Sequence, residues 1–226
     1  LDTLCMNQDK VLKKIKEDNS VDGILFVKTF GVDLDIQPFY RKIKEINNNI
    51  FIIEDMCPCV PVFDYNIEKS YADMSLFSSG YSKYIDIGFG GYGFIKDEKF
   101  IKIFEDLSKN KYFLDYKKTI INKTSLIKIH KNELNSIYKD NIHKKYHLGD
   151  DFINWRFSIL VGNKEEILQA ILEEDGVFAS SHYLQIDYEY KENPMANSNA
   201  NKIHKKIINL FNDFKFTRKQ AYLVVD

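Results

Sequence analysis

The stretch of residues 72–95 constrains the fold most, because two strand patterns flank a loop rich in glycine and hydroxyl groups. Alternating apolar residues lead into the loop, and Tyr92, Phe94 and Ile95 follow it. Its one lysine is Lys83. Just before it lie Ser78, Ser79 and Ser82, and Gly88, Gly90 and Gly91 follow, so we expect Lys83 on a loop between two strands. A lysine in partly apolar surroundings suits Schiff-base chemistry, because desolvation favours the neutral amine. The alternative is a surface lysine beside a glycine-rich hairpin.

A second stretch, residues 50–55, is a short apolar run that ends in Glu54 and Asp55. It predicts a buried strand that carries Asp55 to the carboxyl edge of a sheet, where α/β proteins place ligands. A buried carboxylate at this edge needs a cationic partner. The protonated pyridine nitrogen of pyridoxal phosphate (PLP) is such a partner. The alternative is an aspartate that caps the following turn.

Together these residues resemble the DegT/StrS-type sugar aminotransferases, PLP enzymes of the aspartate-aminotransferase fold (fold type I). The pattern consists of Asp55, D-x3-F-S-x4-K from Asp73 to Lys83, and K-x4-G-x-G-G ending at Gly91. Weaker similarity continues, with gaps, to the C-terminus. The resemblance implies an α/β chain with a partial PLP-binding large domain, a mixed, mostly parallel sheet with flanking helices, and a small α+β C-terminal domain.

The resemblance also implies roles for individual residues. Lys83 matches the lysine that forms the Schiff base with PLP, and Asp55 matches the partner of the pyridine nitrogen. Ser78 matches a serine that contacts the cofactor phosphate. His182 and Lys28 match positions near the substrate. No metal is implied.

The implied activity is PLP-dependent amino transfer to a keto-sugar, carried on a nucleotide, with glutamate as amino donor. The pathway would be polysaccharide or glycoconjugate biosynthesis, and the expected assembly is a homodimer. Cytoplasmic location is expected from only three cysteines and from the lack of an apolar run that spans a bilayer. A formal net charge of -1 argues against nucleic acid as the partner.

The sequence departs from the family in several places. Pro58 stands where relatives have Gln or His, and Lys28 replaces the His of a His-x-x-Gly segment. The family's opening segment, which holds the phosphate, and its Asn-Tyr-Arg-like segment are not recognisable. We therefore expect a truncated or divergent chain that binds PLP weakly unless residues preceding Leu1 or a partner chain contribute.

Two alternatives to aminotransfer stay open. One is a dehydratase, although relatives that dehydrate sugars replace the lysine by His, so Lys83 disfavours it. The other is a degenerate, non-catalytic paralogue that serves as a binding or assembly subunit.

Hydrophobic periodicity predicts the order of elements. A strand over residues 23–28, a helix over 36–47 and the strand over 50–55 predict a right-handed parallel crossover. Further elements are helices over 9–18, 98–107, 126–146, 165–174, 200–210 and 217–225, a strand over 152–161 and a solvated connector over 109–118. The predicted domains are 1–148, the PLP-binding part with its connector, and 149–226.

Overall fold

A computed structural model of the chain describes residues 4–97, 100, 111–152, 155–173, 176, 178–181 and 199–226. The chain divides into two compact units, Leu1–Leu126 and Ile127–Asp226. Each unit has a sheet of its own. Within the described ranges, no helix is long and apolar enough to cross a membrane.

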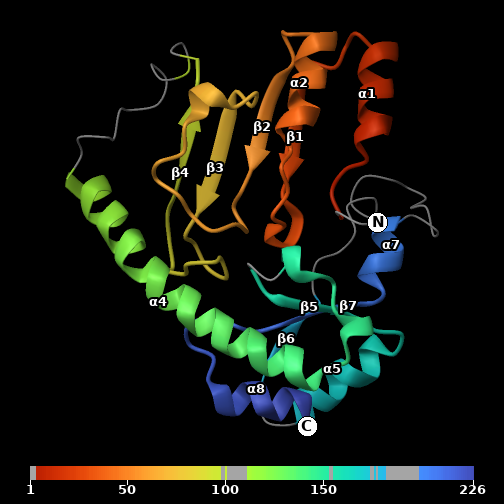
Figure 1. The fold of residues 1–226 in the computed structure, drawn as a ribbon, viewed down its shortest axis with the longest axis vertical. Coiled ribbons are helices and arrows are strands. Elements are labelled where there is room, and N and C mark those ends of the chain that lie inside the picture. The colour runs from red at the N-terminus through yellow and green to blue at the C-terminus, as the bar shows by residue number, and fades with distance from the viewer. Residues whose placement is uncertain are drawn as a thin grey trace. The chain divides into compact units, whose positions relative to one another are not determined.

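The first unit is built on a four-stranded sheet in the order β1-β2-β3-β4. The strands β1, β2 and β3 are parallel, and β4 runs antiparallel to β3, as the arrows of Figure 1 show. Their bounds are Gly23–Val27, Phe51–Asp55, Met74–Ser78 and Gly91–Ile95. The mixed, mostly parallel sheet with flanking helices that the sequence predicts is confirmed. Parallel strands end at the same edge, so the segments that follow β2 and β3 are neighbours.

Two helices, α1 (Gln8–Glu17) and α2 (Gln37–Ile46), pack on one face of this sheet. The side chain of Asn7 caps α1 by accepting the Lys10 N–H at 2.9 Å. The apolar residues of α2 recur at helical spacing, and Tyr40 lies edge-on to Phe26 of β1 with ring centroids 5.8 Å apart. The predicted strand–helix–strand crossover is therefore present.

Strand alternation sends neighbouring side chains to opposite faces of the sheet. Phe26 and Glu54 are paired in register and lie on the face that the helices cover, where Glu54 is 2% exposed. Val27 and Asp55 are paired on the other face, where Asp55 is half-buried. On that face Leu25 is 52% exposed, so the sheet is more open on the side of Asp55.

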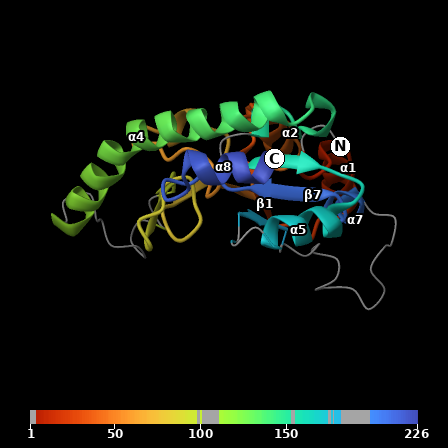
Figure 2. The same cartoon turned by 90° about the horizontal axis from the view of Figure 1, so that it is seen from below.

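The second unit has a three-stranded antiparallel sheet in the order β5-β7-β6. Figure 2 shows β7 between α4 and α5. The core combines apolar residues of the strands with Leu134, Ile137 and Tyr138 of α4 and Ile171 of α5. The bounds of the elements are α4 Lys111–Asn141, β5 Phe157–Leu160, α5 Lys164–Glu173, β6 Ala179–Ser180, α7 Asn199–His204, β7 Ile207–Leu210 and α8 Arg218–Val225. Short 3-10 turns occur at Thr29–Gly31, Ile67–Lys69, Lys144–Tyr146 and Asp150–Phe152.

Three sequence predictions differ from the structure. The helix predicted over 200–210 is wrong in its second half, because Ile207–Leu210 is the central strand β7, buried at every position. The connector predicted over 109–118 lies largely in α4. The compact units meet within α4, not at residue 148, because the second half of α4 packs into the core of the second unit. The helix predicted over 98–107 lies, apart from Phe100, outside the described residues.

Candidate active site

The loop between β3 and β4 holds Lys83 on a fixed backbone. Ser79 N–H donates to Gly90 O at 3.1 Å, and Ile87 N–H donates to Ser79 O at 3.0 Å, so the two ends of the loop are tied together. Lys83 N–H itself donates to Gly80 O at 3.3 Å. The next two residues, Tyr84 and Ile85, are 4% and 0% exposed. Lys83 therefore lies directly before two buried residues, on a loop between two strands, as the sequence predicts.

Two of the loop's glycines are required by the backbone. Gly90 has a φ of +86°, a conformation that residues with a side chain rarely adopt. At Gly91 an added Cβ would lie 2.7 Å from the carbonyl oxygen of Phe77 on the neighbouring strand. Beside them, the hydroxyl groups of Ser79 and Tyr116 are hydrogen-bonded at 2.6 Å. The glycine spacing after Lys83 thus follows from the close approach of β3 and β4.

Asp55 ends β2 at the edge of the sheet beyond which Lys83 lies. Its Oδ1 accepts the backbone N–H of Cys57 at 2.9 Å. The pKa of the Cys57 thiol is raised to about 12, first by burial and then by its hydrogen bond to Asp55 and the charge of Asp55. The positive charge of Lys83 acts on the same thiol in the opposite direction. The charges of Asp55, at the end of β2, and of Lys83, in the loop after β3, therefore both act on the Cys57 thiol, in opposite directions.

The predicted alternative for Asp55, an aspartate that caps the following turn, also describes its bond to Cys57 N–H. The two roles are compatible, because Oδ1 makes that bond and a carboxylate has further acceptor sites. Among the residues that the structure describes, Lys83 Nζ makes no hydrogen bond or salt bridge. A half-buried amine without such a partner is suited to condense with an aldehyde.

The fully buried carboxylate of β2 is Glu54, whereas the sequence argument assigned burial to Asp55. Lys28 Nζ lies 3.4 Å from Glu54 Oε1, and their side chains are 12% and 3% exposed. Tyr65 O–H donates to Glu54 Oε2 at 3.0 Å, and Ser75 Oγ does so at 3.4 Å. The cationic partner that a buried carboxylate needs is thus Lys28. The salt bridge to Glu54 therefore occupies the amine of Lys28, which the resemblance predicted to lie near the substrate.

Of the two remaining predicted site residues, the structure describes Ser78 but not His182. Ser78 is the last residue of β3, and its Oγ accepts the N–H of Gly80 at 3.3 Å, which leaves its own O–H as a donor. His182 lies outside the described residues. Within the described ranges, no group of three His, Cys, Asp or Glu side chains is arranged to hold a metal ion.

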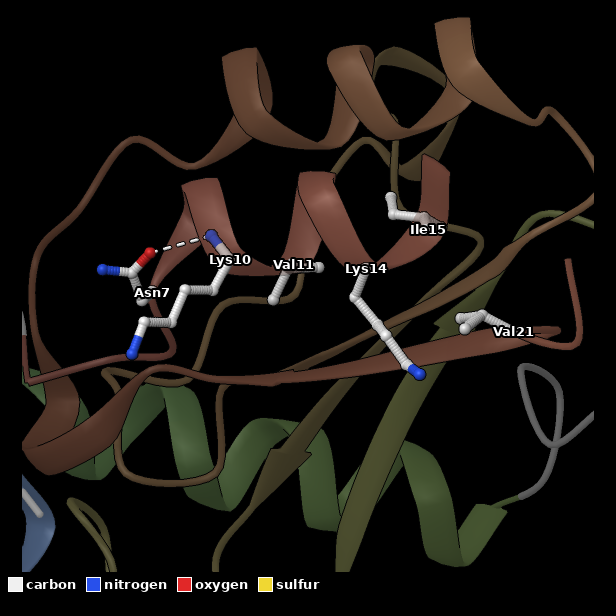
Figure 3. A pocket seen from close by; sticks show the side chains of 6 residues that line it. All are labelled: Asn7, Lys10, Val11, Lys14, Ile15 and Val21. Atoms are coloured by element: carbon white, nitrogen blue, oxygen red, sulfur yellow. Dashed lines mark hydrogen bonds between the residues drawn. The ribbon is translucent and has the colours of Figure 1, made fainter. Parts of the chain in front are cut away.

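A shallow hollow of about 240 Å³ lies beside α1, lined by residues drawn in Figure 3 (Asn7, Lys10, Val11, Lys14, Ile15 and Val21). Its lining is mainly apolar, and Lys14 pairs with Asp18 at 2.7 Å. None of its lining residues belongs to the candidate site.

Comparison with known proteins gives a consistent fold. No family model and no curated protein matches the sequence. Among solved structures, the chain is similar to the sugar aminotransferase Spr1654 of Streptococcus pneumoniae, with a TM-score of 0.73 and 15% identity over 99% of this chain and 72% of that one. A DegT DnrJ EryC1 StrS aminotransferase from Brucella abortus matches with a TM-score of 0.69 and 17% identity, over 99% and 69% of the two chains.

The chain has the fold of the PLP-dependent sugar aminotransferases. A third neighbour of this fold is the GDP-4-keto-6-deoxy-D-mannose-3-dehydratase of E. coli, solved with hydrated PLP bound, with a TM-score of 0.65 and 15% identity over 100% and 72% of the two chains. The fold that the resemblance implies is thus confirmed. Nothing in these comparisons supports the alternative of a non-catalytic paralogue.

The residues of this chain fit PLP at its two chemically demanding points. Asp55 offers a carboxylate at the end of β2, and Lys83 offers an amine in the loop that follows the parallel strand β3. Sequence reasoning named Asp55 and Lys83 but not Cys57, whose backbone N–H binds Asp55. It also missed the pair of Lys28 and Glu54, whose signal was the short apolar run that ends in two adjacent carboxylates.

Proposed function

We propose that this protein is a PLP-dependent aminotransferase that acts on a keto-sugar. The observation that carries the proposal is that Asp55 ends β2 and that Lys83 lies in the loop after its parallel neighbour β3, at the same edge of the sheet, in the fold of the sugar aminotransferases. Lys83 Nζ makes no hydrogen bond or salt bridge to the described residues, so its amine is available for a carbonyl group. PLP supplies an aldehyde and an electron sink when it is bound.

Each residue has a distinct task in this proposal. Lys83 would hold the cofactor through its aldehyde and, once the amino donor had displaced it, its amine would carry a proton during the exchange of amino groups. Asp55 would keep a proton on the pyridine nitrogen of the bound cofactor. Ser78 offers its hydroxyl hydrogen to the phosphate. Cys57 fixes Asp55 through its backbone N–H.

The finer features of the activity rest on the resemblance and on the printed functions of the neighbours. The S. pneumoniae protein is described as a sugar aminotransferase, and the name of the E. coli dehydratase gives a GDP-linked keto-sugar as its substrate. We propose a nucleotide-linked keto-sugar as acceptor and glutamate as donor, in polysaccharide or glycoconjugate synthesis in the cytoplasm. We also propose a homodimer, which light scattering at micromolar concentration tests. A purely monomeric species contradicts it.

Titration with PLP tests the proposal directly. We expect a visible absorbance band in the wild-type chain and none in Lys83→Ala. A matched control is Lys69→Ala, which removes an exposed lysine of the same unit and keeps the band. Addition of glutamate should then change this absorbance band in the wild-type chain, because the amino group passes to the cofactor. A band of equal strength in Lys83→Ala contradicts the assignment of Lys83.

Substitution of Asp55 tests the second residue independently. Asp55→Asn keeps an acceptor for Cys57 N–H but lacks the charge that holds a proton on the pyridine nitrogen. We therefore expect the band to form and the conversion by glutamate to slow by at least about tenfold, the loss of one charge-assisted interaction. Conversion at the wild-type rate removes Asp55 from the site.

The dehydratase neighbour makes sugar dehydration the second candidate reaction. Lys83 disfavours dehydration, because a lysine amine at this position would bond to the cofactor again, and relatives that dehydrate sugars have His there. Analysis of the product from a keto-sugar nucleotide separates the two reactions. An amino-sugar supports aminotransfer, and a deoxy-sugar supports dehydration.

A further inference from the structure

The backbone on which Lys83 stands has one unusual feature. Ser82, directly before Lys83, has a φ of +63°, in the left-handed region that residues with a side chain rarely occupy. Such a conformation costs about 1–3 kcal/mol and persists only where other contacts hold it. One contact at Ser82 comes from Asp86.

Asp86 binds the loop on both sides of Lys83. Its Oδ2 accepts the N–H of Ser82 at 3.0 Å, and its Oδ1 accepts the N–H of Gly88 at 2.8 Å. Gly88 has a φ of +84°, so both amides belong to left-handed residues. Hydrogen bonds from backbone N–H groups to a carboxylate are stronger than those between neutral groups. One side chain therefore fixes two turns of the loop at once.

We propose that Asp86 is a positioning residue, which directs the amine of Lys83 toward Asp55 by holding Ser82 in its left-handed conformation. The inference rests on the proposed function for its consequence, because a fixed amine matters only to a reaction at Lys83. The burial of Tyr84 and Ile85 fixes the loop after Lys83. The hydrogen bond from Ser82 N–H to Asp86 fixes the loop before Lys83. Without Asp86, Ser82 relaxes and Lys83 leaves its place.

Amide hydrogen exchange tests the hold of Asp86 on the loop without any cofactor. In Asp86→Ala we expect the amides of Ser82 and Gly88 to exchange about tenfold faster, and those of β1 to β3 to exchange as in the wild type. The matched control is Asp35→Ala, which removes an aspartate that likewise accepts an N–H two residues on, from Gln37 at 3.1 Å. Unchanged exchange at Ser82 and Gly88 overturns the inference.

Chemical labelling tests whether the hydrogen bonds of Asp86 also fix the position of the Lys83 amine. Acetic anhydride, a small unspecific reagent, should label Lys83 several times faster in Asp86→Ala, because the released amine is more exposed. PLP followed by borohydride should label it about tenfold less, relative to the exposed Lys13 in the same digest. Asp35→Ala should change neither ratio. Both ratios unchanged in Asp86→Ala overturn the inference.

A second variant separates positioning from folding. Glycine tolerates a positive φ, so Ser82→Gly added to Asp86→Ala should restore part of the PLP labelling of Lys83. No recovery contradicts a role through Ser82. Failure of the proposed function gives a different result, because PLP then shows no preference for Lys83 in the wild-type chain. In that case amide exchange and acetic anhydride still decide whether Asp86 positions Lys83.

Discussion

Lys131 gives a prediction about pH that the structure makes quantitative. It lies on α4 in the second unit and is 2% exposed. Its Nζ donates to the carbonyl oxygen of Trp155 at 2.9 Å and to Asn212 Oδ1 at 2.8 Å. The pKa of Lys131 is lowered from 10.5 to about 7, mainly by burial and then by the charge of Arg156, with Asp213 acting in the opposite direction.

The sign of the effect follows from proton binding. Below pH 7 Lys131 carries its proton in the folded and in the unfolded chain. Between pH 7 and about 10 the unfolded chain keeps the proton and the folded chain has lost it. Stability of the second unit therefore rises with pH across this window, because the unfolded state binds more protons.

The size of the rise is calculable from the lowered pKa. One pKa unit corresponds to about 1.4 kcal/mol, and at pH 7 half of the folded molecules have already lost the proton. From pH 7 to pH 9 the contribution of Lys131 to the free energy of unfolding is then about 2 kcal/mol. This exceeds the error of a denaturant titration on a protein of ordinary stability.

Fluorescence of Trp155, the only tryptophan, reports unfolding of the second unit. Urea titrations at pH 7 and pH 9 should show the rise in the wild-type chain and in Lys128→Met, which removes an exposed lysine of the same helix. Lys131→Met should show no such rise between pH 7 and pH 9, whatever the free energy of unfolding of this variant is at pH 7. A rise in Lys131→Met equal to that of the wild type refutes the reasoning.

Three further substitutions test the packing. Gly91→Ala should destabilise the first unit by about 1–3 kcal/mol, because its Cβ would lie 2.7 Å from Phe77 O; urea unfolding followed by circular dichroism measures it. Ile43→Ala should cost about 2–5 kcal/mol in the same assay, since Ile43 is fully buried. Thr217→Ala should cost about 1 kcal/mol by Trp155 fluorescence, because it removes one half of the capping box with Gln220. Changes below about 0.5 kcal/mol contradict each assignment.

Local patterns were sufficient to predict most elements of the first unit. The helix around Ile43 and the strand that ends at Asp55 follow from the local apolar pattern, and the helix predicted over 217–225 is present as α8 in the second unit. The strand at Ile207 was missed because a short apolar run after a helix fits either structure. Its pairing with β5 and β6, which are distant in sequence, decides the outcome.

The candidate site was predictable only in part. Asp55 and Lys83 are recognisable from motif spacing, but their placement at one edge of the sheet depends on the parallel pairing of β2 and β3. Which carboxylate becomes buried depends on which face α1 and α2 cover, and Glu54 faces them. The bonds of Asp86 to Ser82 and Gly88 depend on loop dihedral angles that no spacing rule specifies.

Covalent trapping of the cofactor tests the central claim most directly. The wild-type chain is incubated with PLP, reduced with borohydride, digested and analysed by mass spectrometry. We expect the pyridoxyl group on Lys83, and Asp55→Asn should carry it on the same residue. Label on Lys28, or label spread over exposed lysines with none on Lys83, contradicts the account.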